Sequence, residues 1–197
     1  AFSASAHDPH ATLHFTEHAD GMWVRGRSYK ARVAESGFTY IPFLGSSAPE
    51  NYPVEFRLES ATLAGEVLAL TQGATVSRDG ARFVLDRGPV DVLDDFELES
   101  VEQSFAVDAA GADGDLVLVL SVESGLGGRV TESGLRFECE LGGMDYGLAT
   151  AIDGDGRSVH APMHFTGTDI EVTVPAAFLR EARGVVIVDP ILNTFTV

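Results

Sequence analysis

Histidine side chains that could bind a metal ion gather at the start of the chain. His7, His10, His14 and His18 account for four of the six histidines, and imidazole is a good ligand for zinc or copper. On an extended strand, however, His14 and His18 would lie about 13 Å apart and could not share an ion. Only a helix would bring them onto one face. We therefore expect a solvated face that carries histidines, with a transition-metal site at His10, His14 and His18 as the weaker alternative.

Acidic residues in the segment 153–156 have the spacing of a calcium loop. An EF-hand loop needs an oxygen ligand at its fifth position and a glutamate at its twelfth. In this chain Arg157 and His164 occupy those positions. The Asp-Gly-Asp-Gly sequence is also typical of a hairpin turn. We expect a turn here, with a weak calcium site at Asp153 and Asp155 as the alternative.

Motifs for covalent catalysis or cofactor binding are missing from the sequence. It has no Gly-x-Ser-x-Gly, no His-Glu-x-x-His and no phosphate-binding glycine loop with its lysine. Cys139 is the only cysteine, which excludes an internal disulfide and a cysteine metal cluster. With 30 acidic residues, some carboxylate pairs must lie close together by chance. We expect no catalytic residues and no cofactor.

The charge balance limits the partners of the protein. The sequence has 13 Lys and Arg against 30 Asp and Glu, a formal net charge of -17. Phosphate recognition depends on clustered basic residues, so this composition argues against nucleic acid and against anionic membrane surfaces. The sequence contains no run of about 18 apolar residues, the length that would predict a membrane span. The chain begins at Ala1 without a leader, and we expect an extracellular or cell-surface protein whose signal peptide has been removed.

Strict alternation of polar and apolar residues predicts β-strands that have one buried and one solvated face. This pattern occurs at 29–33, 54–59, 96–99, 135–141 and 170–174. Two continuous apolar runs, 116–120 and 185–188, predict strands that are covered on both faces. Turn sequences rich in Asp and Gly separate these segments at 78–80, 86–89, 112–115 and 153–156.

These patterns predict an all-β fold, an antiparallel β-sandwich with one short helix near 175–183. Pro175 would open the helix and Gly184 would end it. We expect an N-terminal arm or strand over 1–20, the sandwich over 21–188 and a C-terminal strand over 189–197. The loop at 108–115 could divide the sandwich into two subdomains.

Short apolar strands near both ends of the chain suggest a means of assembly. Proline cannot donate to a strand ladder, so Pro190 predicts that the last strand leaves the sheet that holds 185–188. Such a strand could complete its own sandwich or add to the sheet of a neighbour. The side chains that we expect to be inserted are Leu13, Phe15, Ile191, Phe195 and Val197.

Aromatic residues concentrate in the first third of the chain, which suggests a second kind of function. They are Trp23, Tyr29, Phe38, Tyr40, Phe43 and Tyr52. Aromatic platforms bind sugars, but a sandwich also needs such residues for its core. We expect them mainly in the core.

Two stretches, 95–105 and the region from 146 to 191 that ends in Val188-Asp189-Pro190-Ile191, carry a resemblance. They resemble the N-terminal β-rich domain of large secreted bacterial surface proteins, in which such a strand precedes repeat arrays. The resemblance covers about the last hundred residues and transfers no functional residue. It implies an extracellular, non-catalytic module.

Together these observations favour a secreted, non-enzymatic structural subunit that associates with copies of itself through terminal β-strands, as in a filament or surface layer. The alternative is a carbohydrate-binding or adhesive β-sandwich module whose partner is a surface glycan. Neither hypothesis includes nucleic acid or membrane insertion.

Overall fold

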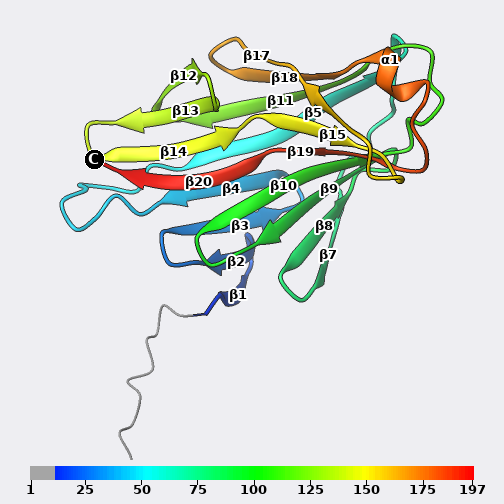
Figure 1. Cartoon of the computed structure of the whole chain (residues 1–197). Helices are drawn as coiled ribbons and strands as arrows, with labels where there is room; N and C mark the ends of the chain where they lie inside the picture. The colour runs from blue at the N-terminus through cyan, green and yellow to red at the C-terminus, as the bar shows by residue number, and fades with distance from the viewer. Residues whose placement is uncertain (1–11) are drawn as a thin grey trace, which may run out of the picture.

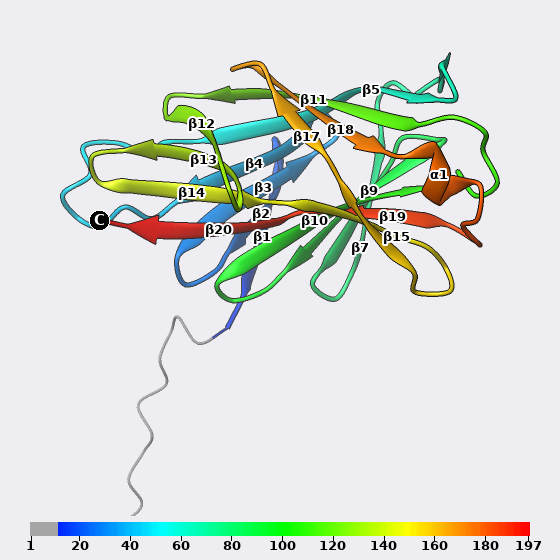
Figure 2. The ribbon, with the colours of Figure 1, turned by 45° about the horizontal axis from the view of Figure 1, so that its top comes forward.

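The computed structural model describes residues 12–197 and confirms the all-β fold class. Two antiparallel sheets pack against each other as a β-sandwich, and 60% of the residues lie in strands. The short helix α1 (Ala176–Leu179) lies at one end of the sandwich, and the C-terminus lies at the other (Figures 1 and 2).

The first sheet runs in the order β1-β2-β3-β4-β5-β11-β18-β17, with β6 beside β5. Every pair in it is antiparallel. Its strands are β1 (His14–His18), β2 (Gly21–Arg25), β3 (Tyr29–Ala34), β4 (Gly37–Pro42), β5 (Val54–Leu63), β6 (Glu66–Val67), β11 (Leu116–Ser124), β17 (Met163–Phe165) and β18 (Asp169–Val174).

The second sheet runs in the order β12-β13-β14-β20-β10-β19-β15-β16, and β9, β8 and β7 continue from the other side of β10. Its strands are β7 (Thr75–Asp79), β8 (Arg82–Asp86), β9 (Val90–Phe96), β10 (Ser100–Val107), β12 (Gly127–Thr131), β13 (Gly134–Cys139), β14 (Gly142–Gly147), β15 (Ala149–Ile152), β16 (Ser158–Ala161), β19 (Val186–Asp189) and β20 (Ile191–Thr196).

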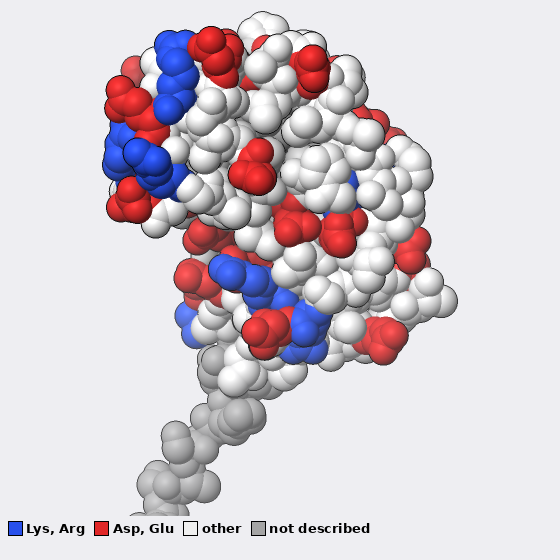
Figure 3. Space-filling view, turned by 90° about the vertical axis from the view of Figure 1, so that its right-hand side faces the viewer, with Lys and Arg blue, Asp and Glu red and all other residues white. Residues whose placement is uncertain are grey.

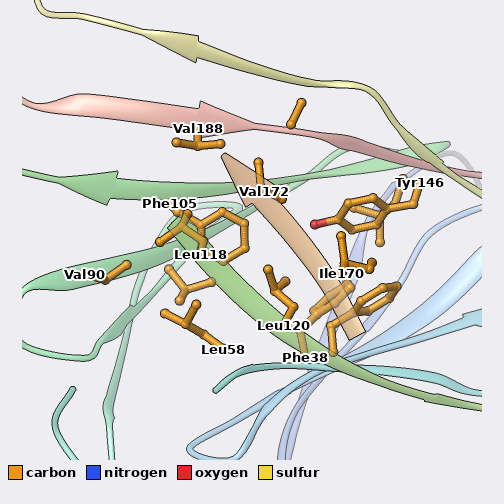
Figure 4. Close-up of a cluster of buried hydrophobic side chains, with 14 of the residues drawn as sticks. Phe38, Leu58, Val90, Phe105, Leu118, Leu120, Tyr146, Ile170, Val172 and Val188 are labelled. Atoms are coloured by element: carbon orange, nitrogen blue, oxygen red, sulfur yellow. The ribbon is translucent and has the colours of Figure 1, made fainter. Parts of the chain in front are cut away.

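One hydrophobic core fills the space between the sheets. Leu118 and Ile170 of the first sheet belong to the same buried cluster as Phe105 and Val188 of the second, as Figure 4 shows. Aromatic rings form part of this core. Of the six aromatic residues named in the first third of the chain, Tyr29, Phe38 and Tyr40 are buried. The preference for core packing is confirmed for these three residues.

The loop at 108–115 joins β10 of the second sheet to β11 of the first. After this loop β11 pairs along its whole length with β5, which precedes the loop in sequence. The two halves of the chain therefore share a sheet and a core, and the loop is a connection within one sandwich.

Three local predictions differ from the structure. Residues 97–99 form the turn between β9 and β10, in which the Glu97 amide donates to the Ser100 carbonyl over 2.9 Å. Helix α1 is four residues long, about half of the predicted length. Neither apolar run is covered on both faces: the second and fourth residues of 116–120 are half-buried on the outside, and in 185–188 Val185 is exposed and Ile187 is half-buried.

Pro190 does not send the last strand to another sheet, so that prediction is wrong. Both β19 and β20 pair with β10, and the register is the same on either side of the proline: Phe105 faces Val188 and Glu102 faces Ile191. The Gln103 amide donates to the Pro190 carbonyl over 3.1 Å, which bridges the interruption. A proline is tolerated here because β10 supplies the donor that the pair needs.

Candidate functional site

The predicted metal ligands near the N-terminus do not converge. His14 and His18 lie at the two ends of strand β1, both exposed on the outer face of the first sheet. His10 lies outside the described residues. Within residues 12–197, no group of three or more His, Cys, Asp or Glu side chains is arranged to hold a metal ion.

Asp153 has a structural role instead of a place in a calcium loop. Its buried carboxylate accepts hydrogen bonds from the backbone amides of Arg157 at 2.9 Å, Asp155 at 3.1 Å and Arg183 at 3.3 Å. Burial alone would raise the pKa of Asp153, but these donors outweigh it and the pKa is lowered. The carboxylate thereby ties the β15–β16 turn to the segment after α1, while Asp155 itself is exposed.

The C-terminal strand is an interior strand of its own sheet. Strand β20 lies between β14 and β10, and Leu192 is fully buried. The Phe195 ring lies under the Arg136 guanidinium, 4.2 Å from its centroid. Ile191 and Val197 are exposed, although the Ile191 backbone pairs with Glu102 of β10 and the Val197 amide donates to the Leu141 carbonyl over 3.4 Å. Of the three side chains here that were expected to insert into a neighbour, Phe195 is held against Arg136, whereas Ile191 and Val197 are exposed.

The N-terminal strand is held at one edge and open at the other. Phe15 lies between the sheets, 6.1 Å from the Phe83 ring, with the Arg78 guanidinium 3.6 Å from the Phe15 centroid. Leu13 is partly buried against the same core. Strand β1 is the terminal strand of the first sheet, and β2 is its one strand partner among the described residues.

A group of cationic side chains, which the sequence patterns did not predict, surrounds the only tryptophan. Trp23 and Arg25 of β2 face Arg32 and Lys30 of β3 across the ladder, on the outer face of the first sheet. The Lys30 ammonium lies 5.7 Å and the Arg32 guanidinium 5.9 Å from the indole centroid. We call this surface the cationic face; its residues are His14, His18, Trp23, Arg25, Lys30 and Arg32.

Asp20 fixes the orientation of the indole. The Trp23 Nε1–H donates to Oδ1 of Asp20 over 3.2 Å, and Arg32 forms an ion pair with Oδ2 of the same carboxylate, also at 3.2 Å. The hydrogen bond from Trp23 and the charge of Arg32 hold the pKa of Asp20 below its ordinary value. Asp20 therefore compensates Arg32, and within residues 12–197 neither Arg25 nor Lys30 has an ion-pair partner.

A hollow of about 500 Å³ opens beside the indole. No carboxylate lines it. Its lining residues are His14, Thr16, His18, Trp23, Val24, Arg25 and Lys30. The alternation in 21–25 and 29–34 could have revealed this face, because it places Trp23 with Arg25 and Lys30 with Arg32 on the polar sides of two consecutive strands.

The opposite end of the same sheet carries acidic residues on its outer face. Glu171 of β18 lies opposite His164 of β17, the other terminal strand, and both are exposed. Glu123 of β11 and Glu55 and Glu59 of β5 continue this surface inward. The only arginine among them, Arg57, is paired with Glu55. Asp and Glu also outnumber Lys and Arg on the face shown in Figure 3, where basic residues occur in small groups.

No helix within residues 12–197 is long and apolar enough to cross a membrane. No protein-family model and no curated protein sequence matches the chain. Its function must therefore be argued from these surfaces.

Proposed function

We propose that this protein is an extracellular, non-enzymatic structural subunit that associates head to tail with copies of itself. The contact joins the two terminal strands of the first sheet, β1 of one copy and β17 of the next. It extends the sheet from molecule to molecule, which is a form of β-augmentation. Because the two surfaces differ, the contact is heterologous, and it forms an open filament when the rotation between successive copies does not close a ring.

Opposite charge at the two ends of the first sheet is the observation that carries this proposal. Arg25 lies next to β1 and Lys30 lies one strand further in, and both lack acidic ion-pair partners within residues 12–197, whereas Glu171 lies next to β17. Complementary charges steer association and fix which surfaces meet. With a formal net charge of -17, copies of this chain repel one another in most relative orientations. The cationic face favours the one orientation in which it meets acidic residues of the next copy.

Strand direction supports the same contact. The eight strands from β1 to β17 alternate in direction, since each neighbouring pair is antiparallel. With an even number of alternating strands, β17 runs opposite to β1. A second copy placed in the same orientation beside the first therefore presents β1 antiparallel to β17, which gives the more stable ladder.

Phe15 makes β1 a fixed edge and not a donated strand. Its ring is held between Arg78 and Phe83 of the second sheet, so pulling β1 away would break both contacts and expose the rings of Phe15 and Phe83. Strand β20 is still less available, because both of its neighbours would have to separate. Of the two strands near the ends of the chain, we therefore assign the contact to β1 and not to β20.

Charge reversal tests the proposal in both directions. At about 10 mM salt, where exposed charges act over about 30 Å, we expect the wild-type chain to form elongated oligomers in light scattering and negative-stain microscopy. Arg25→Glu alone or Glu171→Arg alone should stay monomeric, since like charges then meet at every contact. An equimolar mixture should assemble again, because every contact in an alternating polymer pairs opposite charges.

Arg129→Glu is the control, since Arg129 is an exposed arginine on the other sheet, paired there with Glu138, and its reversal should leave assembly unchanged. A wild-type chain that remains monomeric at millimolar concentration in low and moderate salt would refute the proposal. Assembly that persists in both single variants would also refute it.

A further inference from the structure

We propose that the cationic face is a binding site for an anionic saccharide, a sugar ring that carries a carboxylate or a sulfate. This inference goes beyond self-association: it concerns a ligand on the outer face of β1 to β3, whose Arg25 and Lys30 also supply the charge for the proposed contact at the edge of β1. It rests on the combination of one flat aromatic ring with cations that have no acidic partner within the chain described.

The Trp23 indole supplies the surface for the sugar ring. It lies partly exposed on the outer face of a sheet, where an aromatic ring can stack against the apolar C–H face of a pyranose. Its Nε1–H is held by Asp20, so the ring has a fixed orientation before a ligand arrives. A prepositioned ring loses less conformational entropy on binding.

Lys30 and Arg25 supply the charge for the anionic group. The Lys30 ammonium lies over the indole ring, 5.7 Å from its centroid, and lines the hollow beside it, where it can pair with an anionic group of a ligand. Arg25 is directly opposite Lys30 across the β2–β3 ladder, and its guanidinium contacts the Phe43 ring at 5.7 Å from the centroid. Arg32 is already paired with Asp20 and donates to Thr39, so it holds the site in place and leaves the ligand to the other two cations.

The hollow beside the indole has the dimensions of a small-molecule site. Its volume of about 500 Å³ lies within the range of about 300–1,000 Å³ that is typical of ligand pockets. A long polyanion such as nucleic acid would extend beyond the cationic face onto a strongly acidic molecule and be repelled there. A short anionic sugar unit fits within the cationic face.

The sequence provides two independent reporters within this one site. Trp23 is the only tryptophan, so all tryptophan fluorescence comes from the proposed binding surface. Lys30 is the only lysine, so an amine-reactive reagent modifies it and the N-terminal amine only, and peptide mass spectrometry separates these two products. Each reporter can measure the effect of removing the other.

The probes are a galacturonic acid hexamer, dextran sulfate of low mass and neutral dextran. In moderate salt, where the charge-driven contact between copies is screened, we expect saturable changes in Trp23 fluorescence with one or both anionic probes. Neutral dextran should cause none. The same probe should slow acetylation of Lys30 and leave the N-terminal amine unaffected. A response to the hexamer alone identifies a carboxylate site, and a response to dextran sulfate alone identifies a sulfate site.

Substitutions test the assignment of each residue. Lys30→Gln, followed by fluorescence, should weaken binding at least tenfold, about the effect of one charge-assisted hydrogen bond. Trp23→Ala, followed by Lys30 acetylation, should abolish the protection. Arg129→Gln removes an exposed arginine from the other sheet and should leave affinity unchanged.

No saturation with either anionic probe, equal binding of neutral dextran, or unchanged affinity in Lys30→Gln would each overturn the proposal. Because binding is measured on the monomer, a negative result in this titration would not contradict the assembly proposal. A failure of assembly likewise does not affect the titration.

Discussion

Gln103 donates a hydrogen bond from Nε2 to Oδ1 of Asp94 over 3.1 Å in the interior of the sandwich. The Tyr146 hydroxyl in turn donates to Oε1 of Gln103 over 3.3 Å. Asp94 thus ends a short polar chain within an otherwise apolar core, and its side chain is buried. Burial raises the pKa of Asp94 to about 7, and the hydrogen bond from Gln103 opposes this only in part.

Asp94 should make the stability of the protein depend on pH. Its pKa is raised on folding, so the folded state holds a proton that the unfolded state releases above about pH 4. The free energy of unfolding should therefore fall between about pH 4 and pH 7, by on the order of 4 kcal/mol. Asp94→Asn keeps an acceptor for Gln103 and removes the charge, so it should be more stable than wild type at pH 8 and about equal at pH 4.

Urea unfolding at both pH values measures this difference. Asp91, Glu102 and Asp189 also have raised pKa values, so the slope of the wild-type chain alone is not diagnostic. The comparison with Asp94→Asn isolates one carboxyl. An equal loss of stability in both proteins would show that Asp94 does not titrate in this range.

Asp153 should have the opposite pH dependence. Its folded pKa is lowered, so its contribution is present at neutral pH and is lost as the pH falls through that value. Asp153→Ala leaves three backbone amides without their acceptor and should lower the melting temperature by several degrees at pH 7. The neighbouring exposed Asp155→Ala should leave it almost unchanged. Calorimetry of both variants provides the test, and equal melting temperatures would contradict it.

Phe15 should anchor the N-terminal strand to the second sheet. Phe15→Ala removes the ring between Arg78 and Phe83 and should cost about 1–2 kcal/mol, less than a fully buried phenylalanine because the site is at the edge. Amide hydrogen exchange of 14–18 should accelerate more than that of β3. Thr16→Ala, on the exposed side of the same strand, is the control. Unchanged exchange in Phe15→Ala would place the anchor elsewhere.

Deletion of residues 191–197 should unfold the domain. It removes the buried Leu192 and the hydrogen bond between the Tyr40 and Thr194 hydroxyls, 2.8 Å apart, and it leaves β14 paired with β13 alone. Deletion of Val197 alone, which is 93% exposed, should have little effect. Circular dichroism of both truncated chains measures the outcome. A folded protein after the longer deletion would show that β20 is dispensable.

Several strands could be predicted because their periodicity records burial on one face. The alternation at 54–59 lies within β5, and that at 170–174 forms β18. The same alternation at 96–99 was misleading, since three residues there form a turn that β9 and β10 close by pairing. An alternating pattern of only four residues is too short to separate a strand from the turn that follows it.

Candidate sites were harder to predict because they depend on which strands become neighbours. The sequence places Trp23, Arg25, Lys30 and Arg32 on polar sides of their strands, but only the β2–β3 register brings Lys30 opposite Arg25. Asp153 has the sequence context of a metal ligand, but the fold places the Arg183 amide beside its carboxylate, which accepts a hydrogen bond from that amide instead.

By itself, the sequence determined the fold class, the excess of acidic residues and the positions of four Asp- and Gly-rich turns, since these follow from composition and from the conformational preferences of short segments. Tertiary structure alone decided that Pro190 interrupts a strand without diverting it, that β20 lies inside its sheet and that β1 lies at an edge. The order of strands in a sheet is set by the packing of residues far apart in the chain. Local patterns describe each strand and carry no record of its neighbours.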